Sequence, residues 1–261
     1  MKREMSVCGT FYPNRVDELE RYFAHFEKIY DEQLSLPEIK TRAVIVPHAG
    51  YIYSGFTASI AYRLLAKSGV KKFVVIGPSH KIAFNGVSLA DFESYDTPLG
   101  ELKQDKGLYT KLKEGFSLNF IKEAHSEHST EVQFPFIKHY INDAKILELV
   151  YSDADAFKIS KIINYILSDE EYGVIISTDL SHFYTQDKAN SLDAICLDSL
   201  KQLDLNKLNS GCQACGMIGV KAMMLSAKEL SLKPEVIDYR TSADVSNDES
   251  SVVGYMSAYF K

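Results

Sequence analysis

Short, continuous apolar runs alternate with amphipathic segments along most of the chain, and this alternation constrains the fold more than any other feature. The runs are rich in β-branched residues and too short for helices, and they lie at 43–46, 73–76 and 174–176, with a further strand predicted at 146–150. Uninterrupted apolar strands are typical of a parallel sheet covered on both faces, with helices as crossover connections. The pattern predicts an α/β fold with a mostly parallel central sheet and helices on both faces.

The remaining segments complete this expectation. Apolar residues at helical spacing predict helices at about 15–32, 56–67, 155–168, 188–203 and 214–230. Two further runs, 236–239 and 252–259, are expected to close the sheet as antiparallel strands, and a strand is predicted at 86–90 within the poorly patterned stretch 84–120. We expect a single domain over 1–261, because no linker, low-complexity tract or internal repeat interrupts the sequence.

Charge and hydropathy argue against several classes of partner. The net charge is −6, and the basic residues are dispersed, whereas nucleic-acid binders concentrate them on one face to displace phosphate counterions. No apolar stretch reaches the ~18 residues that a membrane span needs, and the first residues lack the apolar core of a signal peptide. We therefore expect a cytoplasmic protein that binds a small molecule or a peptide, with no nucleic acid and no membrane. The oligomeric state does not follow from the sequence.

The four cysteines are Cys8, Cys196, Cys212 and Cys215. In a cytoplasmic protein they are expected to be reduced thiols. Cys212 and Cys215 have the spacing of a redox or zinc motif, but a lone pair lacks the second pair that a structural zinc site needs. Their flanks do not resemble a thioredoxin active site either. Methionines and an isoleucine follow them, which favours buried residues at the start of a helix.

Three histidines follow predicted strands at their carboxyl ends, where ligands bind in an open parallel sheet. His48 follows 43–46, His80 follows 73–76 and His182 follows 174–176. Neutral imidazole is a good ligand for iron, zinc or copper, so the three rings predict a metal site if their strands are neighbours. Separate, hydrogen-bonded structural histidines remain the alternative, because periodicity does not reveal which strands are adjacent.

A string of histidines and glutamates occupies residues 123–131, before an apolar segment. It can supply groups that orient metal ligands or transfer protons. The alternative is a solvated helix start at which Glu131 complements the helix dipole. For His125 and His139 we favour a structural role.

Seven sequence blocks, spread from one end of the chain to the other, resemble those of one known family. They read GTFYP at 9–13, PHAGYIYSG at 47–55, GPSH at 77–80, TPLG at 97–100, EHSTEVQFP at 127–135, STDLSH at 177–182 and CG at 215–216. Each block alone is weak, but together and in this order they resemble the Memo family over essentially the whole chain.

The resemblance implies a set of metal ligands. The Memo family is similar to the LigB-type extradiol dioxygenases, which hold a non-heme Fe(II) with two histidines and one carboxylate. By motif, the histidines are His48 and His80, and the third position falls on Asp244, where animal members look to carry cysteine. A carboxylate favours Fe(II) over Cu(I), so Fe(II) is expected first, with Zn(II) or copper as alternatives. The alternative for Asp244 is a turn residue in a polar loop.

The resemblance also implies groups that act on a substrate. His182 matches a pocket histidine that moves protons in the related dioxygenases, and Asp179 is expected to orient it. His128 is a further candidate for acid–base catalysis. Tyr51 and Tyr53 are expected to line the substrate pocket, although packing is an equally good explanation for both.

These expectations combine into a metal-binding protein of the Memo type, with a dioxygenase-like, iron-dependent oxidoreductase activity as the leading hypothesis. Two alternatives stay open. One is a module that binds a peptide or a small anion in the same pocket without turnover. The other is a zinc-dependent hydrolase, which a site of two histidines, one carboxylate and a bound water can support.

Overall fold

The computed structural model describes residues 1–33 and 35–261, and an 11-stranded sheet forms its centre. In spatial order the strands are β1 (Lys2–Arg3), β5 (Ser94–Tyr95), β6 (Leu102–Gln104), β7 (Lys145–Tyr151), β3 (Lys72–Pro78), β8 (Tyr172–Ser177), β2 (Ala43–Val46), β11 (Val252–Phe260) and β10 (Pro234–Thr241). Outside this order, β4 (Val87–Leu89) pairs with β7, and β9 (His182–Tyr184) pairs with β11. The predicted α/β fold is confirmed.

The four central strands β7, β3, β8 and β2 are parallel, and β11 and β10 extend the sheet in antiparallel pairing. Alternate residues of the central strands face opposite layers of apolar side chains. Ile45, for example, belongs to one layer, and its neighbours Val44 and Val46 belong to the other. Because both faces are covered, the middle positions of these strands are mostly apolar, which is the pattern that the sequence displays, and Glu148 of β7 is a buried exception.

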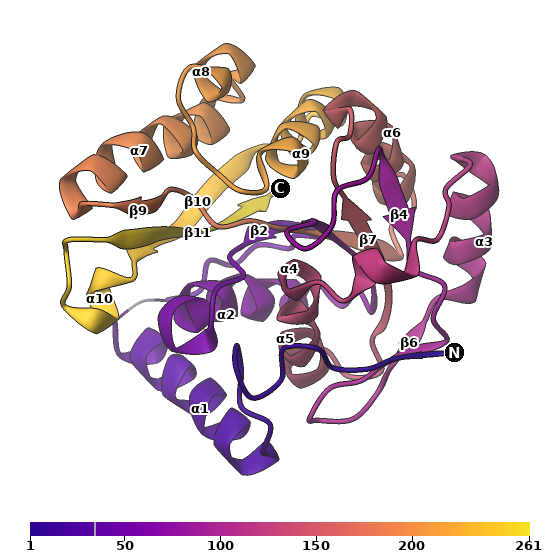
Figure 1. Cartoon of the computed structure of the whole chain (residues 1–261), viewed down its shortest axis with the longest axis horizontal. Helices are drawn as coiled ribbons and strands as arrows, with labels where there is room; N and C mark the ends of the chain where they lie inside the picture. Colours follow the sequence, from indigo (N-terminus) through magenta and orange to yellow (C-terminus); the bar gives the residue numbers. More distant parts are fainter. Residues whose placement is uncertain (34) are drawn as a thin grey trace.

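Helices cover both faces of the sheet (Figure 1). Their bounds are α1 (Val16–Gln33), α2 (Tyr51–Ser68), α3 (Lys106–Gly115), α4 (His128–Glu131), α5 (Gln133–Tyr140), α6 (Ala156–Leu167), α7 (Gln186–Gln202), α8 (Leu205–Asn209), α9 (Met217–Glu229) and α10 (Ala243–Ser246), with a 3-10 turn, η1, at Lys122–His125. Residues of α1, α2 and α5 pack on one face, and residues of α6 and α9 pack on the other. The predicted helices are confirmed, with small shifts at their ends.

Helix α2 begins at Tyr51, before the predicted start at 56, and its first turns include Gly55. Glycine is unfavourable inside a helix, which is why the sequence pattern points to a later start. The structure gives the reason for this glycine. A Cβ atom at Gly55 would lie 2.6 Å from the ring of Phe26 on α1, so glycine allows the two helices to approach closely.

Two of the four cysteines depart from expectation. Cys196 on α7 and Cys212, which follows α8, form a disulfide, whereas Cys8 and Cys215 are free. The prediction of four reduced thiols is therefore wrong for Cys196 and Cys212. Their pairing depends on how α8 folds back on α7, and the spacing of cysteines along the chain does not reveal this.

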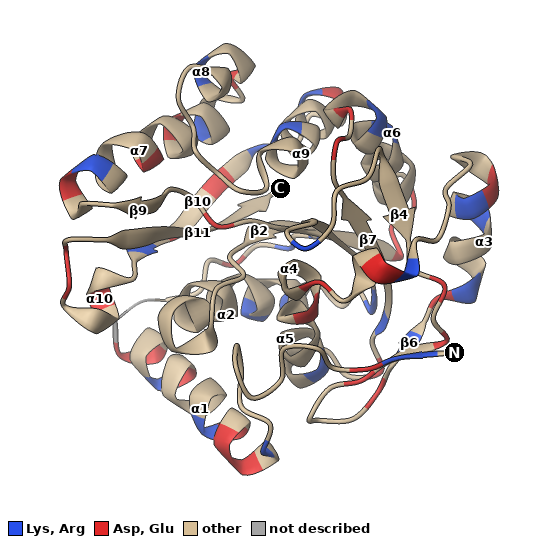
Figure 2. Cartoon of the chain, viewed as in Figure 1, with Lys and Arg blue, Asp and Glu red and all other residues tan. Residues whose placement is uncertain are grey.

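Charged side chains of both signs are interspersed on helices such as α1 and α3 (Figure 2). Within residues 1–33 and 35–261, no helix is both long and apolar enough to cross a membrane.

Candidate metal centre

Neighbouring parallel strands bring the predicted site residues to one edge of the sheet. Strand β8 lies between β3 and β2, so the carboxyl ends of all three strands are adjacent. His48 follows β2, His80 follows β3 and Asp179 follows β8, each shortly beyond the last residue of its strand. The expected adjacency of these strands is thus confirmed.

Three histidines form a group that can hold a metal ion. One ring nitrogen from each of His48, His80 and His128 lies within 4.8 Å of the other two. The ring centroids are 5.2 Å apart for His48 and His80, 5.3 Å for His48 and His128, and 4.6 Å for His80 and His128. His48 is buried, whereas the side chains of His80 and His128 are 32% and 19% exposed. The group is therefore open to solvent on one side.

A single buried carboxylate, that of Glu127, orients two of the three rings. Its Oε1 lies 2.7 Å from Nδ1 of His128 and 3.3 Å from Nδ1 of His80. It also accepts the backbone N–H groups of both histidines, at 2.9 and 2.6 Å. Burial opposes its ionisation, but the hydrogen bonds from His128 and His80 hold the pKa of the Glu127 carboxyl far below its usual range. A charged acceptor at both Nδ1 atoms leaves Nε2 of each ring as the metal-binding atom.

His48 is fixed in a similar way by neutral partners. Its Nδ1 lies 2.9 Å from Oγ of Ser177, and that hydroxyl donates to the carbonyl of Ser129 while it accepts from Nε2 of Gln133 at 3.0 Å. Ser177 is then left to accept from Nδ1–H of His48, and the ring carries its lone pair on Nε2. Burial, together with nearby His80 and His128, holds the pKa of His48 well below its usual value. The neutral ring is the form that binds metals.

Cys215 and Asp179 complete the buried side of the group. Sγ of Cys215 lies 3.2 Å from Nε2 of His48, and Oδ2 of Asp179 lies 3.9 Å from the same atom. Burial, reinforced by Asp179, raises the pKa of the Cys215 thiol to about 12, so the sulfur is protonated at neutral pH. Gly216 permits this approach, since a Cβ atom there would lie 2.6 Å from Cβ of Thr178. The sequence indicated that Cys215 lies at the start of a helix, where it precedes α9, but did not reveal its approach to His48.

Asp244 does not join this group. It is an exposed residue of α10, and its Oδ2 accepts the backbone N–H of Thr241 at 2.7 Å. Short acidic side chains in polar loops commonly close turns in this manner. His128, which the sequence indicated as an acid–base group, occupies the place in the group that was expected for Asp244.

The remaining polar candidates lie around the group. Oδ1 of Asp179 accepts the backbone N–H of His48 at 2.7 Å, so this carboxylate is turned toward His48. Burial raises the pKa of Asp179, while nearby His182 lowers it. His182 itself is half-buried on β9, in register with Val253 of β11. Asp179, which the sequence predicted to orient His182, thus contacts His48 among the hydrogen bonds of the described residues.

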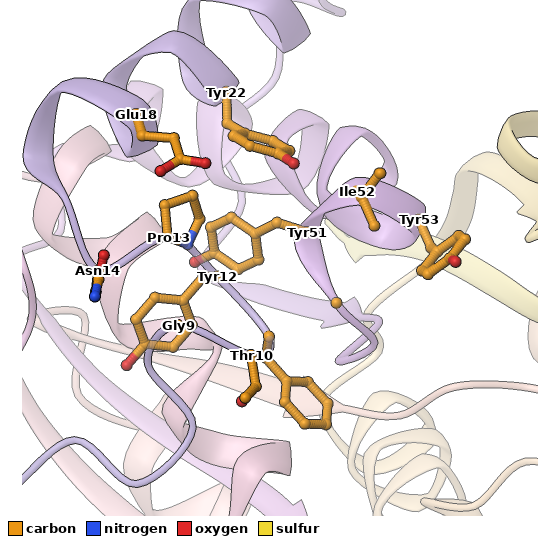
Figure 3. Close-up of a pocket in the computed structure, with 12 residues that line it drawn as sticks. Gly9, Thr10, Tyr12, Pro13, Asn14, Glu18, Tyr22, Tyr51, Ile52 and Tyr53 are labelled. Carbon is orange, nitrogen blue, oxygen red and sulfur yellow. The ribbon is translucent and has the colours of Figure 1, made fainter.

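The two tyrosines belong to a cavity of about 420 Å³ that the segment 9–14 also lines. Tyr51 is buried, donates from its hydroxyl to the carbonyl of Val132 at 2.7 Å, and mainly packs in the core. Tyr53 is 41% exposed, and Figure 3 shows it turned away from Tyr51. Phe11 links the cavity to the metal group, because it lines the cavity and its ring centroid is 4.8 Å from that of His128.

The other two histidines singled out in the sequence lie outside the group. His125 is buried, with Nε2 2.8 Å from Oγ of Ser88 and Nδ1 3.0 Å from Oε2 of Glu148. His139 stacks on Phe23 with 4.1 Å between the ring centroids. Both have structural surroundings, as the sequence favoured.

Comparison with known proteins gives one consistent family. A family model described as "Memo-like protein" matches residues 3–259. Proteins named "MEMO1 family protein" from Methanobrevibacter smithii, Aquifex aeolicus and Thermoplasma acidophilum are 35%, 32% and 33% identical to the chain. The alignments cover 100%, 99% and 98% of this chain, and 100%, 98% and 98% of the respective relatives.

Proposed function

We propose, from the premise that this chain belongs to the Memo-like protein family, that it binds one divalent metal ion through His48, His80 and His128. The observation that carries the proposal is that each of the three Nδ1 atoms has a hydrogen-bonding partner. Glu127 and Ser177 engage all of them, which leaves the Nε2 atoms free to bind a metal ion. Metal-ligating histidines almost always have their other ring nitrogen engaged in this way.

The donor set fits a metal of intermediate softness. Neutral imidazoles suit Fe(II), Zn(II) and copper, and the exposed side of His80 and His128 leaves room for a further ligand. We favour Fe(II), because the His48 and His80 positions resemble those of the iron-dependent extradiol dioxygenases. The reaction that we propose is an oxidation of the dioxygenase type, acting on a small-molecule or peptide ligand that enters by the cavity at Phe11.

The residues of the chain would divide the work as follows. A bound Fe(II) supplies redox chemistry and Lewis acidity. Glu127 holds two rings in one tautomer, and Ser177 holds the third. His182 and Asp179 are the groups that we propose to take up and release protons, since an imidazole can do both near neutral pH. Cys215 lies on the buried side of the group, with Sγ 3.2 Å from Nε2 of His48.

Three neutral histidines favour a second candidate, because catalytic zinc sites also use three protein ligands and a bound water. In that case the same site would support hydrolysis. Anaerobic loading separates the two. Oxygen uptake with the iron form and none with the zinc form supports the oxidoreductase, whereas activity of the zinc form on ester or peptide substrates supports the hydrolase. Binding of a ligand without either activity would indicate a non-catalytic module.

The metal assignment is tested by titrating metal-free protein with Fe(II) and Zn(II) in the presence of competing chelators. Wild type should bind one ion, and alanine at position 48, 80 or 128 should abolish detectable binding. His139→Ala, which lies outside the group, and Asp244→Ala should both retain the ion. Loss of binding in Asp244→Ala with retention in His128→Ala would restore Asp244 as the third ligand. Retention in all three histidine variants would refute the site.

A further inference from the structure

The chain buries a group of charges beside the metal centre, and the proposed function does not use them. Arg3 on β1 is 4% exposed, and Glu131 and Glu148 are fully buried. Nη1 of Arg3 lies 2.6 Å from Oε2 of Glu131, and Nε lies 3.2 Å from Oε2 of Glu148. Taking three charges out of water is costly, and removing one partner would leave an uncompensated buried charge.

Glu131 gathers donors from the N-terminal segment, residues 3–12. Besides Arg3, its carboxylate accepts the backbone N–H of Ser6 at 2.8 Å, the hydroxyl of Ser6 at 2.5 Å and the backbone N–H of Val7 at 2.8 Å. The hydroxyl of Tyr12 donates to it at 2.9 Å. One carboxylate thus holds the whole segment in place by hydrogen bonds and an ion pair. Figure 1 shows this segment in indigo, running from β1 past α4 toward α1.

The N-terminal segment contacts the metal centre and the residues that flank it at three places. The ring of Phe11 packs against that of His128, and the carbonyl of Phe11 accepts the backbone N–H of Tyr51 at 2.8 Å, at the start of the helix that follows His48. Nη2 of Arg3 donates to the carbonyl of Glu127 at 3.0 Å. The segment therefore contacts the chain on both sides of the metal centre, at Glu127 and His128 and at the start of helix α2.

The contacts between Glu131 and the N-terminal segment matter because helix α4 is very short. It has four residues, with His128 at its start and Glu131 at its end. A single helical turn is not stable by itself, because nucleation fixes many dihedral angles for one hydrogen bond. The position of the His128 ring must therefore come from tertiary contacts, and Glu131 supplies those on the side of the N-terminal segment.

We infer that Glu131 is a positioning residue of the metal centre. By holding residues 3–12 against α4, it fixes the ring of His128 and couples the cavity at Phe11 to the metal. This inference rests on the proposed metal binding. Glu131 must be a carboxylate, because all its partners are donors and the amide group of glutamine would face some of them with another donor.

The test compares Glu131→Gln with Glu148→Gln. Both residues are fully buried and both pair with Arg3, but Glu148 makes no side-chain contact with Ser6, Val7 or Tyr12 among the hydrogen bonds of the described residues. In metal-free protein, hydrogen exchange at the amides of Ser6 and Val7 should accelerate in Glu131→Gln and stay near wild type in Glu148→Gln. Equal exchange in Glu131→Gln and wild type overturns the inference, whether or not the protein binds metal.

Zinc titration supplies the second readout. Zn(II) affinity should fall roughly 10–100-fold in Glu131→Gln, as for other groups that position ligands, and should stay within the same order of magnitude in Glu148→Gln. Equal losses in the two variants would show a general loss of stability and refute the positioning role. If wild type itself binds no metal, the proposed function fails. The exchange experiment still shows whether Glu131 holds the N-terminal segment in place.

Two further variants apply if Glu131→Gln does not fold. Ser6→Ala removes one donor to Glu131, and Phe11→Ala removes the contact with the His128 ring without touching the buried charges. Both should fold and bind Zn(II) more weakly than wild type. Unchanged affinity in both would overturn the inference.

Discussion

At the scale of single residues, Glu127 orients two of the three imidazoles in the candidate metal site. Its carboxylate is the shared acceptor for Nδ1 of His80 and of His128, and it also caps α4 by accepting the N–H groups of His128 and Ser129. The same oxygen atoms therefore set ring orientation and helix position. An acidic residue next to a histidine is easily overlooked in a sequence, because its role depends on a second histidine that lies far away along the chain.

We predict that Glu127→Gln weakens metal binding roughly 10–100-fold while the protein stays folded. A glutamine has one oxygen acceptor, so it cannot serve both rings and the backbone groups with equal geometry. Competition titration with Zn(II) measures the effect. Glu123→Gln, at an exposed position of η1, is the control and should match wild type. Equal affinity in both variants would contradict the orienting role.

The pKa of His48 predicts how the stability of metal-free protein depends on pH. Burial holds this pKa well below the usual histidine value of about 6.5, so the folded state excludes a proton that the unfolded state binds below about pH 6.5. The free energy of unfolding should then fall as the pH decreases from 7 to 5, by up to about 1.4 kcal/mol per pH unit from this group. Unfolding by urea at several pH values measures the slope.

The control for this slope is a histidine that stays in water. His48→Gln should show a shallower decline than wild type between pH 7 and 5, because the group that titrates differently in the two states is gone. His25→Gln, at an exposed position, should leave the wild-type decline intact. A decline that is the same in all three proteins would mean that His48 is not the source.

At the scale of elements, the sequence predicted well those strands and helices whose pattern is set within a single segment of the chain. The buried runs of β2, β3 and β8 are apolar throughout because each lies between two layers, and their ends placed His48 and His80 correctly at one edge. Helix α4 and strands β1, β5 and β6 are too short to show any periodicity. The place of His128 in the group and the approach of Cys215 both depend on such tertiary placement, so the sequence indicated His128 only as a candidate acid–base group and did not reveal the contact of Cys215 with His48.

Helices α1 and α2 provide a prediction at this scale. Gly55→Ala should improve the intrinsic helix propensity of α2 by about 1 kcal/mol. It should nevertheless destabilise the protein by a net ~1–3 kcal/mol, because the new Cβ would lie 2.6 Å from the ring of Phe26 and force the helices apart. Denaturant unfolding gives the difference. Phe26→Leu combined with Gly55→Ala should recover part of the loss, and a simple sum of the two effects would contradict direct contact.

At the scale of the whole molecule, the stability of the corner formed by α7 and α8 depends on a covalent link. In Figure 1 this corner lies beside β9 and β10, and its buried Leu200 and Leu208 belong to the same apolar layer as the residues of α6 and α9. The Cys196–Cys212 disulfide joins α7 to the segment that leads into Cys215, across a sequence separation of 16 residues. The link therefore restrains the same segment that brings Cys215 to His48.

We predict that Cys196→Ala combined with Cys212→Ala lowers the free energy of unfolding by about 3 kcal/mol, the chain-entropy value for a loop of this length. Denaturant unfolding without reductant measures the loss. A reductant should lower the stability of wild type by a similar amount and leave the double variant unchanged. Thiol titration of the unfolded, unreduced protein gives an independent check. Cys8 and Cys215 should react while Cys196 and Cys212 do not, because the disulfide survives unfolding. If all four cysteines react, the protein is reduced as isolated, and the α7–α8 corner is held by packing alone.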